Sequence, residues 1–188
     1  MSDFFIYFVY FFVYSVLGWI TETIYCRILD GKWTNRGFLF GPYCPIYGCG
    51  ALLIIAFLNN FIASPIKVFF LGMLFTSALE YVSSLILEKM FNAKWWDYSN
   101  RKFNINGRIC LLNSFEFAVL GLLLTYLIQP FLSNIVLNIP LELLQLISLV
   151  LITIMGIDTG STIATLLNLK ERLYALKESS EMLKAKNM

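Results

Sequence analysis

The chain of 188 residues contains no histidine. This absence excludes histidine general bases, Ser-His triads and histidine-ligated metal sites within the chain. Charged residues are also scarce, at 14% of the chain against roughly 25% in a soluble domain. Hydrophobic residues make up 59% and aromatic residues 16%, which is typical of lipid-facing surfaces and interfacial belts. The composition therefore indicates an integral membrane protein, without room for a separate soluble catalytic domain.

Five apolar stretches approach the length of about 20 residues that a transmembrane helix needs. They cover residues 4–28, 45–62, 65–87, 109–131 and 140–167. The N-terminus has neither the basic region nor the cleavage site of a signal peptide, so the first stretch is expected to remain as a helix. We therefore expect an all-α fold. It comprises a polytopic membrane domain of five transmembrane helices at 1–167 and a cytoplasmic amphipathic helical tail at 168–188.

The basic residues predict how these spans are oriented. Five spans place the two termini on opposite sides of the membrane. Of the 14 lysine and arginine residues, Lys67 alone falls on the side of the N-terminus, and the others lie toward the two long loops or in the tail. Since cytoplasmic loops carry the excess of Lys and Arg, we predict the N-terminus outside and the C-terminus inside. The tail could lie on the membrane, pack on a partner or continue the last span into solvent.

Carboxylates occur inside the apolar spans, where each costs about 2.5–3.5 kcal/mol on insertion scales. Glu22, Glu80, Glu116 and Asp158 fall within predicted spans, and Glu88 lies just beyond the third span. A helical rise of about 1.5 Å per residue places the first four in the cytoplasmic half of the membrane. Polar companions at helical spacing predict that these acids face the bundle interior and not lipid.

Two interpretations of these acids remain open. They could line one acidic cavity, open toward the cytoplasm, that binds a cationic substrate, a metal ion or transferable protons. Asn113, three residues before Glu116, would then belong to the same site. Because close carboxylates cannot all ionise in a low dielectric, such a cavity would suit proton coupling. Alternatively, Arg36 and Arg108 could neutralise the acids as structural ion pairs, since buried charges must be paired.

The first long loop is irregular in sequence yet apolar. Gly41, Pro42 and Pro45 disfavour a regular helix that begins before Pro45. Irregular backbone at membrane depth is tolerated only against protein or a water-filled cavity. The segment is therefore either a broken or re-entrant approach to the second span, lining a site, or a tight interfacial loop with Pro45 in the first helical turn.

The second long loop combines aromatic and turn-forming residues. Its candidate site residues are Trp96, Asp97, Tyr98, Asn104, Asn106 and Gly107. Trp and Tyr favour the headgroup level of a membrane, which predicts an interfacial anchor. The Asn-Gly pair is a turn signal.

The two loops also suggest a weak parallel repeat, although chance could produce it. The first copy reads Glu22, Trp33, Asn35-Arg36-Gly37-Phe38 and Gly41, and the second reads Glu80, Trp95, Asn100-Arg101-Lys102-Phe103 and Gly107.

Other chemistries are not favoured. The sequence Asp158-Thr159-Gly160-Ser161 matches the local motif of aspartic proteases, but it lies in a predicted helix and has no second copy. The four cysteines all fall toward the reducing cytosol and lack a C-x-x-C pair, so we expect neither disulfides nor a thiolate metal site. No metal and no cofactor is expected.

Several motifs together resemble one bacterial family. They are Gly18-Trp19 with Glu22, Asn35 to Phe38 with Gly41-Pro42, Pro45-Ile46-Tyr47-Gly48, Trp96-Asp97-Tyr98-Ser99, and Asn104 to Arg108. The chain resembles, over residues 11–167, the CmpB-like "ABC-transporter type IV" family of small membrane proteins. The resemblance implies a multi-pass protein of the bacterial cytoplasmic (inner) membrane and adds Trp19, Asn35 and Tyr47 to the candidate site. Since the chain has no Walker A loop, any ATPase partner must come from another gene.

Three functions are compatible with these observations. The first is a transport-type protein, such as a small transporter, channel or permease subunit, acting as a homo-oligomer because five spans enclose little volume. The second is a membrane-embedded enzyme acting on a lipid or an interfacial substrate. The third is an assembly or regulatory subunit whose loops and tail dock a partner. The lipid bilayer is the expected environment, and no nucleic-acid partner is expected.

Overall fold

The structure is a computed structural model that describes residues 2–31, 33 and 37–186. Apart from one pair of two-residue strands, its regular elements are helices, as the sequence predicts. In chain order the elements are α1 (Ser2–Asp30), α2 (Pro45–Leu58), the 3₁₀ turn η1 (Asn59–Phe61), α3 (Pro65–Phe91), β1 (Asn104–Ile105), β2 (Ile109–Cys110), α4 (Leu111–Leu123), the π-helical segment η2 (Leu124–Ile128), α5 (Gln129–Val136) and α6 (Leu141–Lys186).

Four stretches of helix are long and apolar enough to cross a membrane: Asp3–Ile28, Pro65–Phe91, Leu111–Val136 and Leu141–Leu173. The helical stretch Pro45–Phe61 is apolar but shorter. At the usual helical rise it reaches about 26 Å, less than the roughly 30 Å of a hydrocarbon core. The expectation of a multi-helix membrane protein is thus confirmed, while five crossings and their orientation remain predictions.

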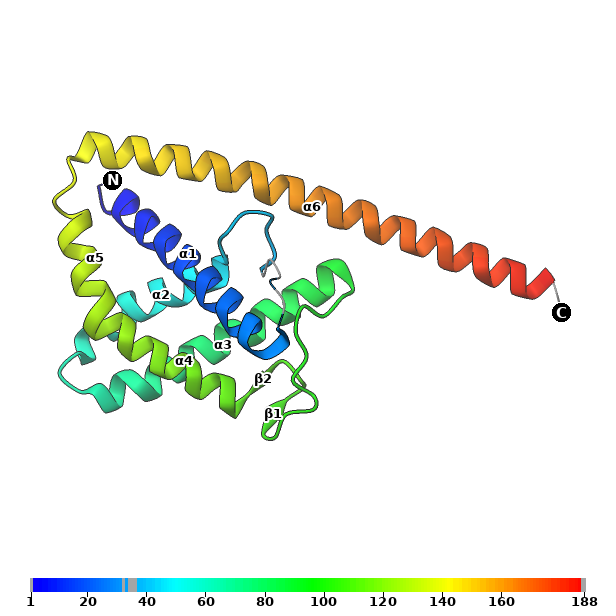
Figure 1. Ribbon diagram of the computed structural model, residues 1–188, viewed down its shortest axis with the longest axis horizontal. Coiled ribbons are helices and arrows are strands. Elements are labelled where there is room, and N and C mark those ends of the chain that lie inside the picture. The colour runs from blue at the N-terminus through cyan, green and yellow to red at the C-terminus, as the bar shows by residue number, and fades with distance from the viewer. Residues whose placement is uncertain (1, 32, 34–36, 187–188) are drawn as a thin grey trace.

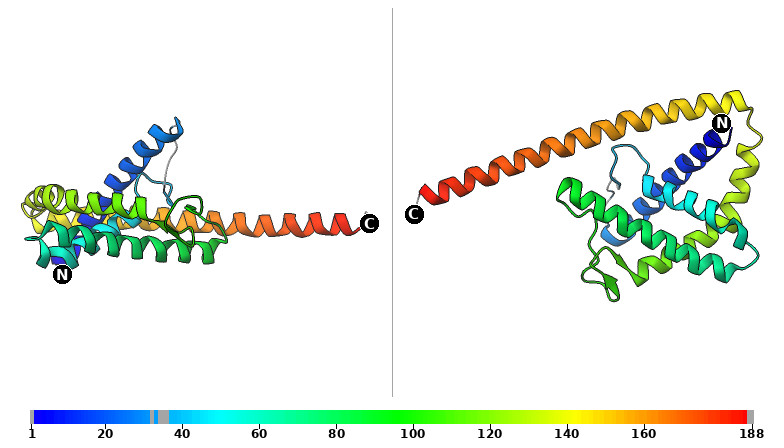
Figure 2. Two further views of the ribbon diagram at one scale, coloured as in Figure 1. Left: turned by 90° about the horizontal axis from the view of Figure 1, so that it is seen from below. Right: turned by 180° about the vertical axis from the view of Figure 1, so that it is seen from behind.

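The helices run back and forth between two ends of a bundle (Figure 1). The N-terminus, the η1 connection and the α5–α6 connection lie at one end. At the opposite end, called the loop end below, α1 and α3 finish and the β1–β2 hairpin leads into α4. Helix α6 continues without interruption from the fifth predicted span into the charged tail and extends well past the bundle (Figure 2).

The chain approaches α2 as irregular backbone that lies deep against α1. Leu39 and Tyr43 are almost fully buried, and they form a cluster with aromatic residues of α1 such as Phe12. The Cys44 N–H donates to the carbonyl of Ser15, which lies near the middle of α1. Helix α2 therefore begins beside the middle of α1 and not beside its end. This geometry favours the broken approach to the second span over a tight interfacial loop.

Two helices extend further than the sequence suggested. Helix α3 runs to Phe91, so Glu88 lies inside the third candidate span and not beyond it. It ends where Asn92 adopts a left-handed conformation and returns its N–H to the Glu88 carbonyl. The fourth span continues past Pro130 to Val136 because a π-helical segment precedes the proline and accommodates its missing N–H.

Small residues let α1 and α2 approach closely, as is common between membrane helices. A Cβ atom added to Gly48 would stand 2.5 Å from the carbonyl oxygen of Phe11 and in contact with the Ser15 hydroxyl. The Tyr47 ring lies directly on the backbone of Gly18, where a Cβ atom would overlap it. The main apolar core is built around this contact from residues of α1 to α6, among them Tyr14, Ile54, Leu58, Val68, Leu124 and Leu144.

This contact makes Gly48→Ala destabilising. The added methyl group meets backbone, which cannot rotate away, so α1 and α2 must separate, and such overpacking costs about 1–3 kcal/mol. Thermal unfolding in detergent micelles measures the effect. The matched control is Gly156→Ala on α6, where nothing in the described structure lies within 4 Å of the added atom. Equal stability of the two variants would contradict the packing described here.

Candidate functional site

Glu80 on α3 is held at the loop end by a chain of side-chain hydrogen bonds. The residue is 5% exposed, and Oε1 of its carboxylate accepts a hydrogen bond of 3.0 Å from the Tyr98 hydroxyl. The Tyr98 oxygen in turn accepts from Nδ2 of Asn113 at 2.7 Å, and Oδ1 of Asn113 faces the Cys110 thiol at 3.3 Å. The second carboxylate oxygen, Oε2, is buried and has no hydrogen-bond partner among the described residues. Glu80 is therefore held by a hydrogen bond at one carboxylate oxygen, while the other oxygen has none among the described residues.

Glu22 on α1 belongs to the same site. The hydroxyl of Tyr47, in the first turn of α2, donates to Oε2 of Glu22 at 2.6 Å. Because Tyr47 lies against Gly18, the approach of α1 to α2 sets the position of this bond. Glu22 also lies within electrostatic range of Glu80 and Tyr98. The two acids thus come from different helices and meet at one place, each bound by a tyrosine hydroxyl.

Burial, reinforced by the carboxylates of Glu80 and Glu22, raises the pKa of the Tyr98 phenol above its usual range. Tyr98 consequently keeps its proton and acts as a donor to Glu80. Glu116 on α4 is half-buried, and its charge acts on Tyr25 of α1 together with that of Glu22. The positive charge of Arg101, from the second long loop, acts on Tyr25 in the opposite sense. Trp19, next to Gly18 on α1, is half-buried.

Asp158 on α6 has a different set of partners. Its carboxylate accepts hydrogen bonds from the backbone N–H groups of Phe40 (3.1 Å) and Gly41 (2.8 Å), and from the Tyr43 hydroxyl (2.6 Å). The Thr162 hydroxyl completes the set at 3.2 Å. These bonds satisfy backbone groups that the irregular approach to α2 leaves without helical partners. Asp158 thus holds this segment in place, and we call this set of bonds the Asp158 clamp. Within the segment Pro42 is exposed, and Pro45 is the first residue of α2.

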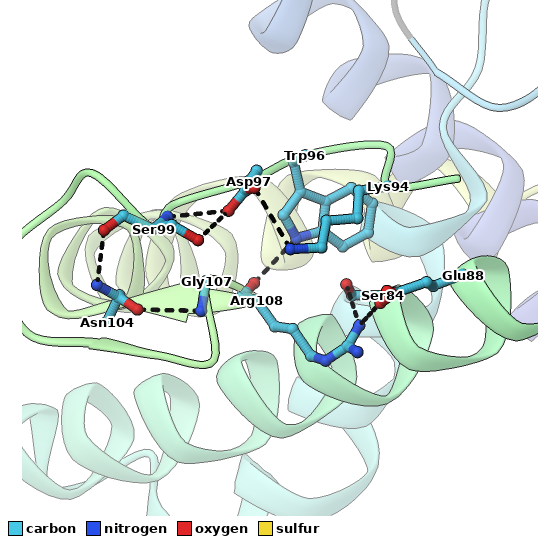
Figure 3. Close-up of polar contacts among 9 residues, drawn as sticks. All are labelled: Ser84, Glu88, Lys94, Trp96, Asp97, Ser99, Asn104, Gly107 and Arg108. Carbon is cyan, nitrogen blue, oxygen red and sulfur yellow. Dashed lines mark hydrogen bonds and ion pairs between the residues drawn. The ribbon is translucent and has the colours of Figure 1, made fainter. Parts of the chain in front are cut away.

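Arg108 neutralises Glu88 and not the acids Glu22 and Glu80. Its guanidinium forms an ion pair with Glu88 on α3 and donates to the Ser84 hydroxyl at 3.1 Å (Figure 3). It also lies over the Tyr81 ring. The ion-pair interpretation therefore describes Glu88, which the sequence had placed outside the span. Arg36 and Asn35 lie outside the described residues, so their predicted roles, and the repeat that includes them, remain predictions.

The second long loop is a hydrogen-bonded frame that carries Tyr98 and Arg108, and Figure 3 shows the bonds around Asp97, Asn104 and Arg108. Asp97 accepts from the backbone N–H and the hydroxyl of Ser99, and it pairs with Lys94 at 3.4 Å. Trp96 donates its indole N–H to the carbonyl of Arg108 at 2.9 Å. The tryptophan expected to be an interfacial anchor is therefore half-buried and bonded within the loop.

The Asn-Gly turn closes this frame. Asn106 and Gly107 have φ of 54° and 68°, the positive values that a tight hairpin turn requires. A Cβ atom at Gly107 would stand 2.6 Å from the Asp97 carboxylate, so only glycine fits there. Oδ1 of Asn104 accepts from the Gly107 N–H at 3.0 Å, and Nδ2 of Asn106 donates to the Tyr81 hydroxyl at 2.9 Å. These loop residues act by ordering the frame.

A crevice of about 80 Å³ opens between α2, α3 and α4, with Glu80 in its wall. Its other walls include the Tyr47 and Phe117 rings, Thr76, and the backbone at Gly50 and Gly121. Sequence reasoning did not identify the crevice. The small residues Gly50 and Gly121 within apolar helices were the available signal. Among the described residues there is no group of three Cys, Asp or Glu side chains that could hold a metal ion, and the four cysteines are free.

The Asp158 clamp predicts that Asp158→Asn exposes Cys44, which is 5% exposed and joins the clamped segment to α2. The two backbone N–H groups bond to different oxygens of Asp158, so the NH₂ group of an amide faces one of them and loses that bond, and a bond to a charged acceptor is worth about 1.5–3 kcal/mol. In a Cys49→Ser background, alkylation of Cys44 in micelles should accelerate at least about tenfold. Thr162→Val, which removes one bond of four, should show a smaller effect. An unchanged rate in Asp158→Asn would contradict the clamp.

The loop frame predicts a pH-dependent contribution to stability. The Ser99 hydroxyl and N–H hold the pKa of Asp97 below its ordinary value of about 3.9. Because the folded state favours the ionised form, the contribution is complete above that value and disappears as the pH falls through the lower folded pKa. The thermal stability of the wild type should therefore exceed that of Asp97→Asn near neutrality and converge with it at low pH. A constant difference across this range would refute the assignment.

Comparison with known proteins bears on the chain as a whole. Neither a characterised protein nor a solved structure shows significant similarity to it. A family model described as "Putative ABC-transporter type IV" matches residues 9–163, which confirms the resemblance seen in the sequence motifs. The match spans the bundle from α1 to the Asp158 clamp, and the chain therefore belongs to the ABC-transporter type IV family of CmpB-like membrane proteins.

Proposed function

We propose that the protein is a transport-type membrane protein, a small transporter, channel or permease subunit, whose acidic site acts on a cation or a proton-coupled substrate. One observation carries this proposal. Glu80 is 5% exposed, yet one of its carboxylate oxygens has no hydrogen-bond partner among the described residues and the group borders a crevice. The family description of an ABC-transporter type agrees with this function.

The environment of the two acids supports a positively charged cargo. Glu22 and Glu80 are bound by tyrosine hydroxyls, which are neutral donors. The ion pairs among the described residues are Lys94–Asp97 and Arg108–Glu88, and neither neutralises the site. Two neighbouring carboxylates in a low dielectric repel each other and are stabilised by a cation or a shared proton. A site of this kind can bind a positive charge and release it again.

The location follows from the distribution of charge. The positive-inside rule places the loop end in the cytoplasm, so the acidic site would open to the cytoplasmic side of a bacterial inner membrane. We further propose that the protein assembles as a homo-oligomer, because a single bundle encloses little volume. A separate ATPase subunit would supply energy if the protein works as a permease component.

Neutralising either central acid should abolish transport. With Glu22→Gln or Glu80→Gln in proteoliposomes, we expect at least about a tenfold loss of potential-driven proton or potassium flux, because each variant removes one of the two tyrosine-bound carboxylate charges that attract the cation. Entrapped pH-sensitive and potassium-sensitive dyes measure the two fluxes.

Glu142→Gln serves as the control, because Glu142 is exposed in the first turn of α6 at the opposite end of the bundle. It should transport like the wild type. Far-ultraviolet circular dichroism checks that all three variants fold. Wild-type flux in both folded site variants would refute the proposed function.

A further inference from the structure

We propose that the part of α6 beyond the bundle docks a leucine-rich helix with acidic flanks from a separate protein. The contact surface is the leucine stripe, defined as Leu166, Leu169, Leu173 and Leu176. This inference goes beyond the transport function, since it concerns the tail and not the acidic site. Three features carry it: the face of α6 that the stripe continues, the direction of the helix and the sign of the flanking charges.

The stripe continues the face by which α6 packs on the bundle. Ser148, Met155 and Thr162 are buried and follow one another at intervals of seven residues. Such an interval keeps one side of a helix turned toward a packing partner. Ser148 is bonded to α1, and Met155 packs on α1 and on the approach to α2. The next two steps of seven reach Leu169 and Leu176, so the stripe extends the same face.

The bundle no longer covers this face at the stripe. The Lys170 ammonium group donates to the carbonyl of Met90 at 2.9 Å, and Met90 lies in the last turn of α3. Residue 170 of α6 therefore lies beside the loop end. Leu169, Leu173 and Leu176 are each more than half exposed. The face thus becomes rich in leucine where the bundle ceases to cover it, which is typical of a surface that binds another protein.

The direction of the helix argues against the membrane as the cover. A basic amphipathic helix buries its apolar face in lipid when it lies in the plane of the membrane surface. Helix α6 is continuous from Leu141 to Lys186, with no proline or glycine after Gly160 in the sequence. It runs past the bundle as a single rod (Figures 1 and 2) and extends about 24 Å beyond Lys170 at about 1.5 Å per residue. The stripe therefore leads away from the bilayer that the first part of α6 is long and apolar enough to cross.

The residues beside the stripe are basic. In the heptad that has Leu173 at position a and Leu176 at position d, positions e and g flank the stripe. These positions hold Lys170, Arg172, Lys177, Ser179, Lys184 and Lys186. The acids of this segment fall at positions f and b on the other side of the helix, and they are Glu171, Glu178 and Glu181. A partner helix complements the flanks when it carries Asp or Glu on its own.

A second copy of the chain does not complement these flanks. Copies with the same orientation in one membrane have tails that run in the same direction, so they can pair only in parallel. In a parallel pair, position g of one helix faces position e of the following heptad of the other, which sets Arg172 against Lys177. Like charges juxtaposed across an interface destabilise it. The occupant of the stripe is thus a different protein.

A designed peptide serves as the probe. It has about four heptads with Leu at a and d and Glu at e and g, and it carries a fluorescein label. The full chain is placed in nanodiscs that contain phosphatidylglycerol, so that an anionic membrane competes for the stripe, and fluorescence anisotropy measures binding relative to empty nanodiscs. The acidic peptide should bind at least about tenfold more tightly than the same peptide with Gln at e and g. This difference should shrink as NaCl rises from about 50 mM to about 500 mM.

Variants on the two sides of the tail locate the contact. Leu173→Ala should weaken binding of the acidic peptide at least about tenfold, because it removes apolar surface from the centre of the stripe. Alanine favours a helix, so the tail stays helical in this variant. Leu167→Ala is the matched control and should bind like the wild type, since Leu167 is also exposed but stands at position b. Arg172→Glu should weaken the acidic peptide and leave the Gln peptide unchanged.

Three results would overturn the inference. The first is absence of binding in the nanodiscs, and binding restored in micelles would then identify lipid as the cover. The second is tighter binding by a peptide of the chain's own residues 163–186 than by the acidic peptide, which would make a second copy the occupant. The third is equal binding by the wild type and Leu173→Ala. Cation flux does not enter these measurements, so their outcome is independent of the proposed transport function.

Discussion

The rest of this structure depends on one constraint: a polar group among apolar membrane helices must find its partner within the protein, because lipid offers none. The clearest case is Asp158. Its carboxylate receives the backbone N–H groups of Phe40 and Gly41, which no helix satisfies. Without these bonds, irregular backbone could not lie beside the middle of α1, and α2 would have to begin at the bundle end. Asp158 thus determines where a neighbouring helix starts.

Tyrosine hydroxyls fulfil the same requirement for the other acids. Tyr47 binds Glu22 because α2 packs on α1 without a side chain at Gly18, and Tyr98 binds Glu80 because the second loop is ordered by its own hydrogen bonds. Each acid is therefore tied to a contact between elements and not only to its own helix. A change in the loop frame or in the α1–α2 contact is therefore transmitted directly to a carboxylate.

Much of this arrangement can be predicted from the sequence, since apolar length predicts the helices and intramembrane acids predict a site. The hydrogen-bond partner of each acid cannot be predicted in this way. It depends on how the helices are rotated and shifted against one another, which the periodicity of the sequence does not encode. The sequence grouped Asp158 with Glu80, yet Asp158 binds the approach to α2. No motif predicts that the Trp96 indole donates to the carbonyl of Arg108. The sequence placed Glu88 outside the third span because a charged residue resembles a boundary, whereas the helix continues until Asn92 stops it.

The contrast between Glu80 and Glu88 bears most directly on function. Both lie on α3, two turns apart, and a single loop supplies the side chain that binds each of them. Arg108 neutralises Glu88, whereas Tyr98 gives Glu80 a hydrogen bond and no charge. A purely structural solution would place an arginine against the more deeply buried acid, since that charge costs more. Here the more exposed acid is neutralised, whereas the buried one borders a crevice and has one oxygen without a hydrogen-bond partner among the described residues. That distribution is what a site requires if its positive charge is to arrive and leave with a ligand.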